Sequence, residues 1–346
     1  DRFRGGTEAS HSGVLRRCPV HVTIHRMNVR SLAKEMTIPV LYRTGLLRAA
    51  DRRLGRAGVV ALSYHNVNSA VFRTHADFLS QRTQILDPNN FGNEVSDPTR
   101  SHRPMVILTF DDGYKSFVDE IHPILESHGF QALWFVPTNY LGSEQAFWFD
   151  QIQLAIEASP TDKISIGPRV WKLPKHGRRY AAYRIKTFMK SARPDLLDSM
   201  VEEVLDQTGS PPIEALKNQM LTDEAGIQAL DGRGVHVASH SRSHRNLTVL
   251  DDDELNDELV GSKQQLESVL NREVAHFAFP SGDHDERVLS AVRSAGYQWA
   301  WTTEARYVNT ADLPYQIPRV LIDDEASVAT LAAKISPWIH RAGLVK

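Results

Sequence analysis

The feature that most constrains the fold is a series of short apolar runs separated by stretches long enough to form helices. The clearest runs cover residues 59–64, 106–110, 132–137, 235–239, 274–279, 298–302 and 316–321. Short runs rich in β-branched and aromatic residues are typical of buried strands. Helical patterns lie between several of them, at about 115–128, 251–271 and 285–295. Alternating strands and helices predict an α/β fold with a parallel sheet.

Two carboxylates follow one of these predicted strands directly. Asp111 and Asp112 come after the run that ends at Phe110, and Gly113 breaks the pattern. They are therefore expected at the carboxyl end of a parallel strand, the edge from which α/β folds draw their catalytic groups. The alternative is that an aspartate here only caps the next helix.

Two histidines follow another predicted strand in the same way. The run at 235–239 is followed by His240 and His244. One carboxylate and two imidazoles form a three-ligand open site suited to Zn²⁺, and the second carboxylate can then act as a base toward water. Histidine pairs at this spacing also occur on solvated surfaces, and that alternative stays open here.

Residues 109–113 together with 239–244 resemble the first two motifs of the NodB-type polysaccharide deacetylases, carbohydrate esterase family 4. The resemblance extends over about residues 59–321. It implies an α/β fold of a specific form, a distorted (β/α)7 barrel. It also implies one divalent metal ion, expected to be zinc, bound by Asp112, His240 and His244, with Asp111 as the catalytic base.

The third family motif is altered in this chain. Residues 278–282 keep the proline and glycine of the usual Arg-Pro-Pro-Tyr-Gly pattern but lack its arginine and tyrosine. Arg319, which follows Pro318 in a late strand, is the candidate to hold Asp111 ionised through a bidentate contact. Alternatively, it is a surface strand residue. Phe279 and Ser281 are expected to contact the substrate, with a backbone N–H near Ser281 stabilising the oxyanion.

The late Leu-x-His motif that usually supplies the general acid is also missing. His340 matches it poorly, whereas His65 ends the first strand-like run. This arrangement is similar to the circularly permuted branch that includes the poly-N-acetylglucosamine deacetylases, in which an early Tyr-His supplies the acid. We therefore expect His65 to be the acid, and the alternative is a structural histidine.

Residues 140–222 are too long for one simple crossover, which predicts a helical insertion over the strand ends. Residues 160–174 look irregular, and 180–208 look helical. Trp148 is a candidate for stacking on a sugar and Asp150 for bonding a sugar hydroxyl, although such aromatic clusters more often pack in a core.

The first 58 residues form a basic extension ahead of the predicted barrel at 59–346. They contain 12 lysines or arginines against 4 acidic residues, leaving 28 against 38 in the rest. Leucines at 41, 47 and 54 predict an amphipathic helix over about 40–56, which either contacts a membrane surface or docks on the barrel. Whether the residues before Met27 are natural stays open.

The remaining composition places few limits on the cellular setting. Cys18 is the only cysteine, so an intrachain disulfide is excluded. No apolar run is long enough to span a membrane and no clear secretory signal is present, so the location is open, with the cytoplasm or a membrane surface favoured. Nucleotide-binding glycine motifs are absent, and we expect no nucleic-acid partner.

These patterns lead to one predicted function and two alternatives. The prediction is a metal-dependent hydrolase that removes acetyl groups from N-acetylated sugars of a polysaccharide or other glycan. The alternatives are an amide hydrolase of the same fold with a small non-carbohydrate substrate, and an inactive glycan-binding protein. The identity of the glycan, the atom that loses the acetyl group, the native metal and the oligomeric state stay open.

Overall fold

Parallel strands form the centre of the computed structural model, which describes residues 37–54, 58–96, 103–217 and 219–344. One sheet has the order β10–β1–β3–β4–β7–β8–β9, with the short β2 also paired to β3. All of its pairings between strands are parallel. The strands are β1 (Val59–Tyr64), β2 (Gln84–Ile85), β3 (Met105–Phe110), β4 (Ala132–Val136), β7 (Val235–Ser239), β8 (His276–Ala278), β9 (Trp299–Trp301) and β10 (Arg319–Leu321).

The two ends of this sheet approach each other and nearly close it into a barrel. β10 pairs with β1, and Ile317, just before β10, bridges to Trp301 at the end of β9. The Ile317 N–H donates to the carbonyl of Ala300 at 3.0 Å, and the Thr302 N–H donates to the carbonyl of Ile317 at 2.8 Å. The prediction of a distorted barrel of parallel strands is confirmed. Because every strand runs the same way, all carboxyl ends lie at one mouth.

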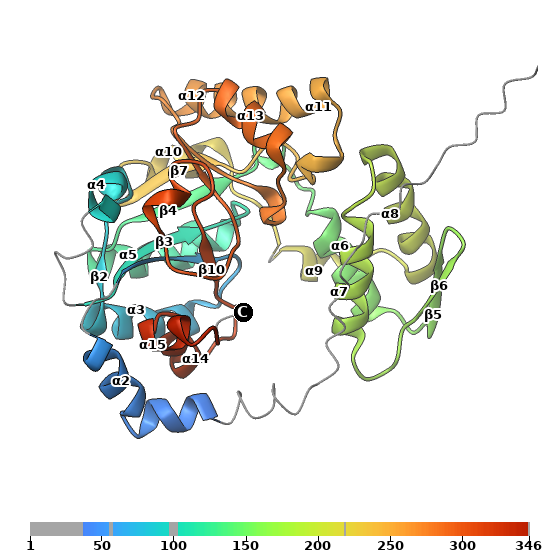
Figure 1. Ribbon diagram of the computed structural model, residues 1–346. Helices are drawn as coiled ribbons and strands as arrows, with labels where there is room; N and C mark the ends of the chain where they lie inside the picture. The colour runs from blue at the N-terminus through green and yellow to red at the C-terminus, as the bar shows by residue number, and fades with distance from the viewer. Residues whose placement is uncertain (1–36, 55–57, 97–102, 218, 345–346) are drawn as a thin grey trace, which may run out of the picture.

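Helices surround this sheet (Figure 1) and pack their apolar faces on it. The helix predicted at about 115–128 ends at His128, and Gly129 follows it with a φ of 64°. The helix predicted at 251–271 begins with a capping box at Asp251 and contains a turn of π-helix at 257–261. The helices around the barrel are α3 (Ser69–Arg82), α4 (Phe91–Ser96), α5 (His122–His128), α10 (Glu224–Leu230), α11 (Asp252–Asn256), α12 (Ser262–Leu270), α13 (Glu286–Ser294), α14 (Val328–Lys334) and α15 (Pro337–Arg341).

The described part of the basic extension packs on the barrel's outer helices. Residues 37–43 are helical, Gly45 has a φ of 75°, and α2 (Leu46–Leu54) follows. The single helix predicted for 40–56 is thus interrupted, because this glycine adopts a left-handed conformation that ends the first helix. Leu47 is buried against Ala332 and Ile339, as the docking alternative requires. Residues 1–36 and 55–57 of the extension lie outside the described part.

Among the helices of the described ranges, none combines the length and the apolar character that a membrane span requires.

The segment between β4 and β7 forms a compact unit beside the barrel mouth (Figure 1) with an apolar cluster of its own. It contains α6 (Trp148–Ala158), β5 (Lys163–Ile166), β6 (Arg169–Lys172), α7 (Arg178–Met189), α8 (Pro194–Thr208) and α9 (Ile213–Lys217). The interpretation of 160–174 as irregular was wrong, since β5 and β6 pair as an antiparallel hairpin. Alternating residues such as Ile164, Ile166 and Trp171 face its core. The division of the chain into extension, barrel and insertion remains our prediction.

The returning end of this insertion runs along the turn after β3. The Thr222 N–H donates to the carbonyl of Gly113 at 3.0 Å, and the Lys115 N–H donates to the carbonyl of Met220 at 2.9 Å. Tyr114 and Leu221 form an antiparallel bridge between these contacts. The insertion therefore supports the turn that carries Asp111 and Asp112.

Candidate active site

Backbone strain is concentrated at the carboxyl ends of the strands. Five non-glycine residues in the described ranges have φ in the left-handed region, and Asp112, Ser241, His244 and Ser281 are four of them. Such conformations are unfavourable for most residues and gather at functional sites. At Gly113, with φ of 70°, a Cβ atom would lie only 2.9 Å from Val136. A glycine is thus required at position 113, in the turn that orients the carboxylates of Asp111 and Asp112.

Asp112, His240 and His244 converge at this mouth. Asp112 Oδ1 lies 3.6 Å from His240 Nε2 and 3.3 Å from His244 Nε2. One ligand atom of each residue lies within 4.8 Å of the others. The structure therefore brings together the three residues that the sequence predicted as metal ligands.

The chemistry of these three groups fits a divalent cation. His240 Nδ1 donates to the carbonyl of Ala278 at 2.8 Å, which leaves the lone pair of Nε2 directed at Asp112. Asp112 Oδ1 is buried without a hydrogen-bond donor. An orphaned buried carboxylate oxygen beside two imidazoles requires an explanation, and a bound cation supplies one.

Electrostatics keep two of the three ligands, Asp112 and His240, in binding-competent forms. Burial lowers the pKa of His240 to about 4, so this imidazole is neutral near pH 7. Burial alone would raise the pKa of Asp112, but His244, His65 and His240 together lower it well below its ordinary value. An ionised carboxylate and a neutral imidazole are the protonation states that metal binding needs. Burial would lower the pKa of His244, but Asp112 and then Asp111 raise it, so a cation bound there would displace a proton from this imidazole.

Asp111 is held by a buried arginine. Arg319 Nη1 donates to Asp111 Oδ1 at 2.6 Å and Nη2 donates to Oδ2 at 2.9 Å. The Arg319 side chain is completely buried, so the surface alternative for it is wrong. Its Nε donates to the carbonyl of Thr302 at 3.0 Å, which fixes the plane of the guanidinium. Burial would raise the pKa of Asp111, but Arg319 first, then His240 and His65, lower it.

His65 lies at the end of β1, beside Asp111. Its Nε2 is 3.8 Å from Asp111 Oδ2, and its side chain is 35% exposed. The preceding Tyr64 points away into the helix layer, where its ring stacks on Phe110. The structure therefore places His65 at the mouth and partly open to solvent, where a substrate group can reach it.

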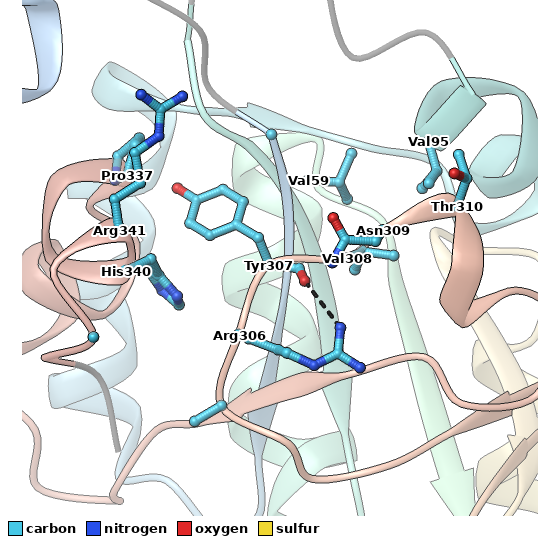
Figure 2. A pocket seen from close by; sticks show the side chains of 13 residues that line it. Val59, Val95, Arg306, Tyr307, Val308, Asn309, Thr310, Pro337, His340 and Arg341 are labelled. Atoms are coloured by element: carbon cyan, nitrogen blue, oxygen red, sulfur yellow. Dashed lines mark hydrogen bonds between the residues drawn. The ribbon is translucent and has the colours of Figure 1, made fainter. Parts of the chain in front are cut away.

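His340, the competing acid, lies elsewhere. It belongs to α15 and borders a cavity of about 680 Å³ beside Val59, the first residue of β1 (Figure 2). Its Nε2 is 2.6 Å from the carbonyl of Lys334. Since Val59 and His65 are at opposite ends of β1, His340 is remote from the other candidate residues.

The predicted substrate residues differ in how they are placed. Ser281 is exposed at the mouth, in a turn after β8. Phe279 is completely buried and packs on Phe277, so its side chain cannot contact a substrate as expected. Trp148 packs against the insertion core, which matches the core-packing alternative. Asp150 accepts a hydrogen bond from the Tyr114 hydroxyl at 2.9 Å, so a protein group already occupies one of its oxygens.

Comparison with known proteins identifies the family of this chain. Residues 99–300 match the family model described as polysaccharide deacetylase, which covers more than half of the chain. The chain belongs to the polysaccharide deacetylase family.

Individual relatives agree with this assignment. The chain is 25% identical over 328 residues to poly-β-1,6-N-acetyl-D-glucosamine N-deacetylase from Escherichia coli K12, covering 88% of this chain and 42% of that protein. It thus spans less than half the length of that relative. Among solved structures, IcaB from Ammonifex degensii has a TM-score of 0.54 at 16% identity, covering 81% of this chain and 97% of that one. The Streptococcus pyogenes deacetylase PplD has a TM-score of 0.53 at 16% identity, covering 82% and 100%. Both structures support the fold.

Several residues that support this candidate site were not predicted from the sequence. The Ser63 hydroxyl lies 3.3 Å from Asp111 Oδ2, directed at it as a donor. Glu258, in the π-helical turn before α12, accepts from the backbone N–H groups of Arg242 and Ser243 at 2.8 and 2.9 Å. These bonds fix the loop that presents His240 and His244. Ser63 is adjacent to the Tyr64-His65 pair, whereas nothing in the local sequence marks Glu258.

Proposed function

We propose that this polysaccharide deacetylase is a metal-dependent amidohydrolase that removes acetyl groups from the nitrogen of N-acetylated sugars in a glycan. The observation that carries the proposal is the buried pair of Asp111 and Arg319 directly beside the cluster of Asp112, His240 and His244. Asp111 is then available for proton transfer, while Asp112 faces the two imidazoles. This division of roles is what hydrolysis of an amide requires.

The metal site is proposed to take one divalent cation, most suitably zinc. Two imidazoles and one carboxylate, with a remaining open position, form the ligand set of catalytic zinc sites. When bound there, the cation supplies Lewis-acid chemistry, activating water and polarising the acetyl carbonyl.

Asp111 is proposed to be the general base. Arg319 occupies both of its oxygens with charge-assisted hydrogen bonds, which fixes the carboxylate plane and keeps it ionised. In this state Asp111 can accept a proton from the attacking water without changing its position. The Ser63 hydroxyl, 3.3 Å from Oδ2, further restricts the carboxylate.

His65 is proposed to protonate the leaving amine. An amide nitrogen leaves poorly unless it receives a proton, so a positioned acid is needed. His65 is the partly exposed imidazole next to Asp111, and its Nε2 lies 3.8 Å from Asp111 Oδ2. This arrangement permits the proton taken by Asp111 to be balanced by one delivered from His65. A backbone N–H near Ser281 is proposed to stabilise the oxyanion.

The substrate class is proposed from the family and from the named relative. Poly-β-1,6-N-acetyl-D-glucosamine is the polymer in the name of the E. coli protein to which 88% of this chain aligns. A polymer of N-acetylated glucosamine is therefore the first substrate to test, with O-acetylated glycans and small acetamides as comparisons.

The experiment combines metal analysis with acetate release on this panel. We expect about one divalent ion per chain and metal-dependent acetate release from N-acetylated oligosaccharides. The double variant His240→Ala, His244→Ala should lose both, whereas His236→Ala, within the strand β7 that precedes them, should retain both. Full metal content in the double variant would refute the site. Acetate release from O-acetylated glycans alone would refute the amide specificity, and glycan binding without turnover would support an inactive binding protein.

A further inference from the structure

The outer face of α7 exposes two tyrosines. The Tyr180 side chain is 52% exposed and that of Tyr183 61%. Their ring centroids are 6.4 Å apart, and the ring planes differ by 23°. The opposite face of α7 is buried in the insertion core through Ala181, Ala182, Ile185 and Met189. The helical period therefore holds both aromatic rings in solvent.

The two ends of this helix reach two loops at the barrel mouth. Near its start, Arg179 Nη1 lies 3.9 Å from Glu325, in the loop after β10. Just past its end, Lys190 Nζ lies 3.1 Å from Asp283, in the loop after β8. Exposed pairs of this kind add little stability, but they show where α7 lies. Positions 179, 183 and 190 share one side of a helix, so Tyr183 lies on the side of α7 that makes these two contacts with the loops.

The same segment is strongly basic. Residues 163–194 contain ten lysines or arginines and no aspartate or glutamate. The neighbouring α8 carries five acids, but Asp198 among them pairs with Arg245, and Glu203 accepts from the Gly167 N–H. The tyrosines are flanked on one side by Arg179 and Lys190, each beside a carboxylate of a barrel loop, and on the other side by Arg184.

Building on the proposed deacetylase function, we propose that this face, made of Arg179, Tyr180, Tyr183 and Lys190, is a subsite for the glycan. It binds a sugar next to the one that loses its acetyl group, and Tyr183 stacks on that sugar. Large exposed aromatic surface continuous with a catalytic mouth is typical of ligand binding.

The test compares an oligosaccharide with a single sugar. Tyr183→Ala should lower kcat/KM for acetate release from an N-acetylglucosamine pentasaccharide roughly two- to tenfold, in line with the strength of aromatic contacts. It should leave release from one N-acetylated sugar unchanged. Tyr183→Phe keeps the aromatic plane and should retain activity. Val170→Ala, a control that removes exposed apolar surface from β6 on the hairpin, should have no effect.

The outcomes separate this inference from the proposed function. Equal losses for the oligosaccharide and the single sugar in Tyr183→Ala would overturn the subsite, as would unchanged activity on both. If wild type released no acetate from any glycan, the proposed function would fail while the subsite stayed testable. Calorimetric titration with the pentasaccharide would then support the subsite if Tyr183→Ala bound more weakly than Val170→Ala, and overturn it if both bound equally.

Discussion

Arg319 and Asp111 form a two-pronged ion pair inside the barrel, with N–O distances of 2.6 and 2.9 Å and both side chains almost completely buried. The two residues come from strands on either side of β1. A charge pair at this depth is strongly coupled to both stability and chemistry, since either partner alone is an uncompensated buried charge.

Breaking this pair should therefore cost stability and turnover together. We expect Arg319→Gln to lower the free energy of unfolding by roughly 3 to 5 kcal/mol, the usual cost of orphaning a buried charge. Arg272→Gln, which breaks a partly exposed pair with Asp231, should cost clearly less. Denaturant unfolding of both variants checks this. Similar losses in the two would show that the buried pair has no special energetic role.

The two adjacent aspartates should separate metal binding from proton transfer. Asp111→Asn should retain metal and lose roughly 10² to 10⁴ in kcat, the value of a general base. Asp112→Asn should lose metal as well as turnover, because it removes the charged ligand of the cluster. Metal content and kcat measured on the same preparations decide the matter. Equal metal loss in both variants would contradict this assignment of roles.

The role of His65 can be tested through the leaving group. His65→Ala should keep fold and metal but lower kcat for amides much more than for an activated aryl acetate, whose leaving group needs little protonation. His340→Ala, at the other end of the barrel, serves as the matched control. Equal slowing of amide and ester by His65→Ala, or an amide-selective loss in His340→Ala, would remove His65 from this role.

His276 should make the barrel sensitive to acid. Burial, aided by His236 and Arg272, lowers its folded-state pKa to about 3, and its Nδ1 accepts a bond from Trp301 Nε1 at 3.2 Å. In the unfolded chain this imidazole binds a proton near pH 6.5, whereas in the folded protein it does so only near pH 3. Protonation therefore favours the unfolded chain, so the contribution of His276 to the free energy of unfolding is complete above pH 6.5 and declines as the pH falls toward 3. At pH 5 the loss is about 2 kcal/mol.

Replacement of His276 isolates this effect from that of other buried histidines. In His276→Gln the difference in unfolding free energy between pH 7.5 and pH 5 should shrink by about that amount. His176→Gln, at an exposed position, should leave the difference unchanged. An identical acid loss in His276→Gln and wild type would show that His276 does not contribute.

Local sequence was sufficient for the parts of the site that lie at strand ends. The strands that precede these residues, β3 and β7, are each marked by a short apolar run, and the parallel topology then brings Asp111, Asp112, His240 and His244 to one mouth. The family resemblance added Arg319, whose partner follows a strand two places away in the sheet.

Other features of the fold and of the site could not be predicted from the sequence. Glu258 holds the histidine loop from a helix that shows only an ordinary amphipathic pattern. The β5–β6 hairpin was missed because Ile164 and Ile166 alternate over only four residues, too few to distinguish from a loop. Phe279 was misplaced because a motif position does not reveal whether a side chain faces the mouth or the core.

The returning end of the insertion limits how far this protein can be shortened. Gly142 and Thr222 are joined by a hydrogen bond of 3.0 Å, which suggests a splice point. A chain rejoined there would discard residues 219–221, including the bridge to Tyr114 and the Met220 carbonyl bonded to Lys115. The part of the insertion that can be removed is therefore shorter than the whole segment between β4 and β7. A trimmed enzyme must keep this strip of backbone, or it loses the brace of the turn that aims its carboxylates.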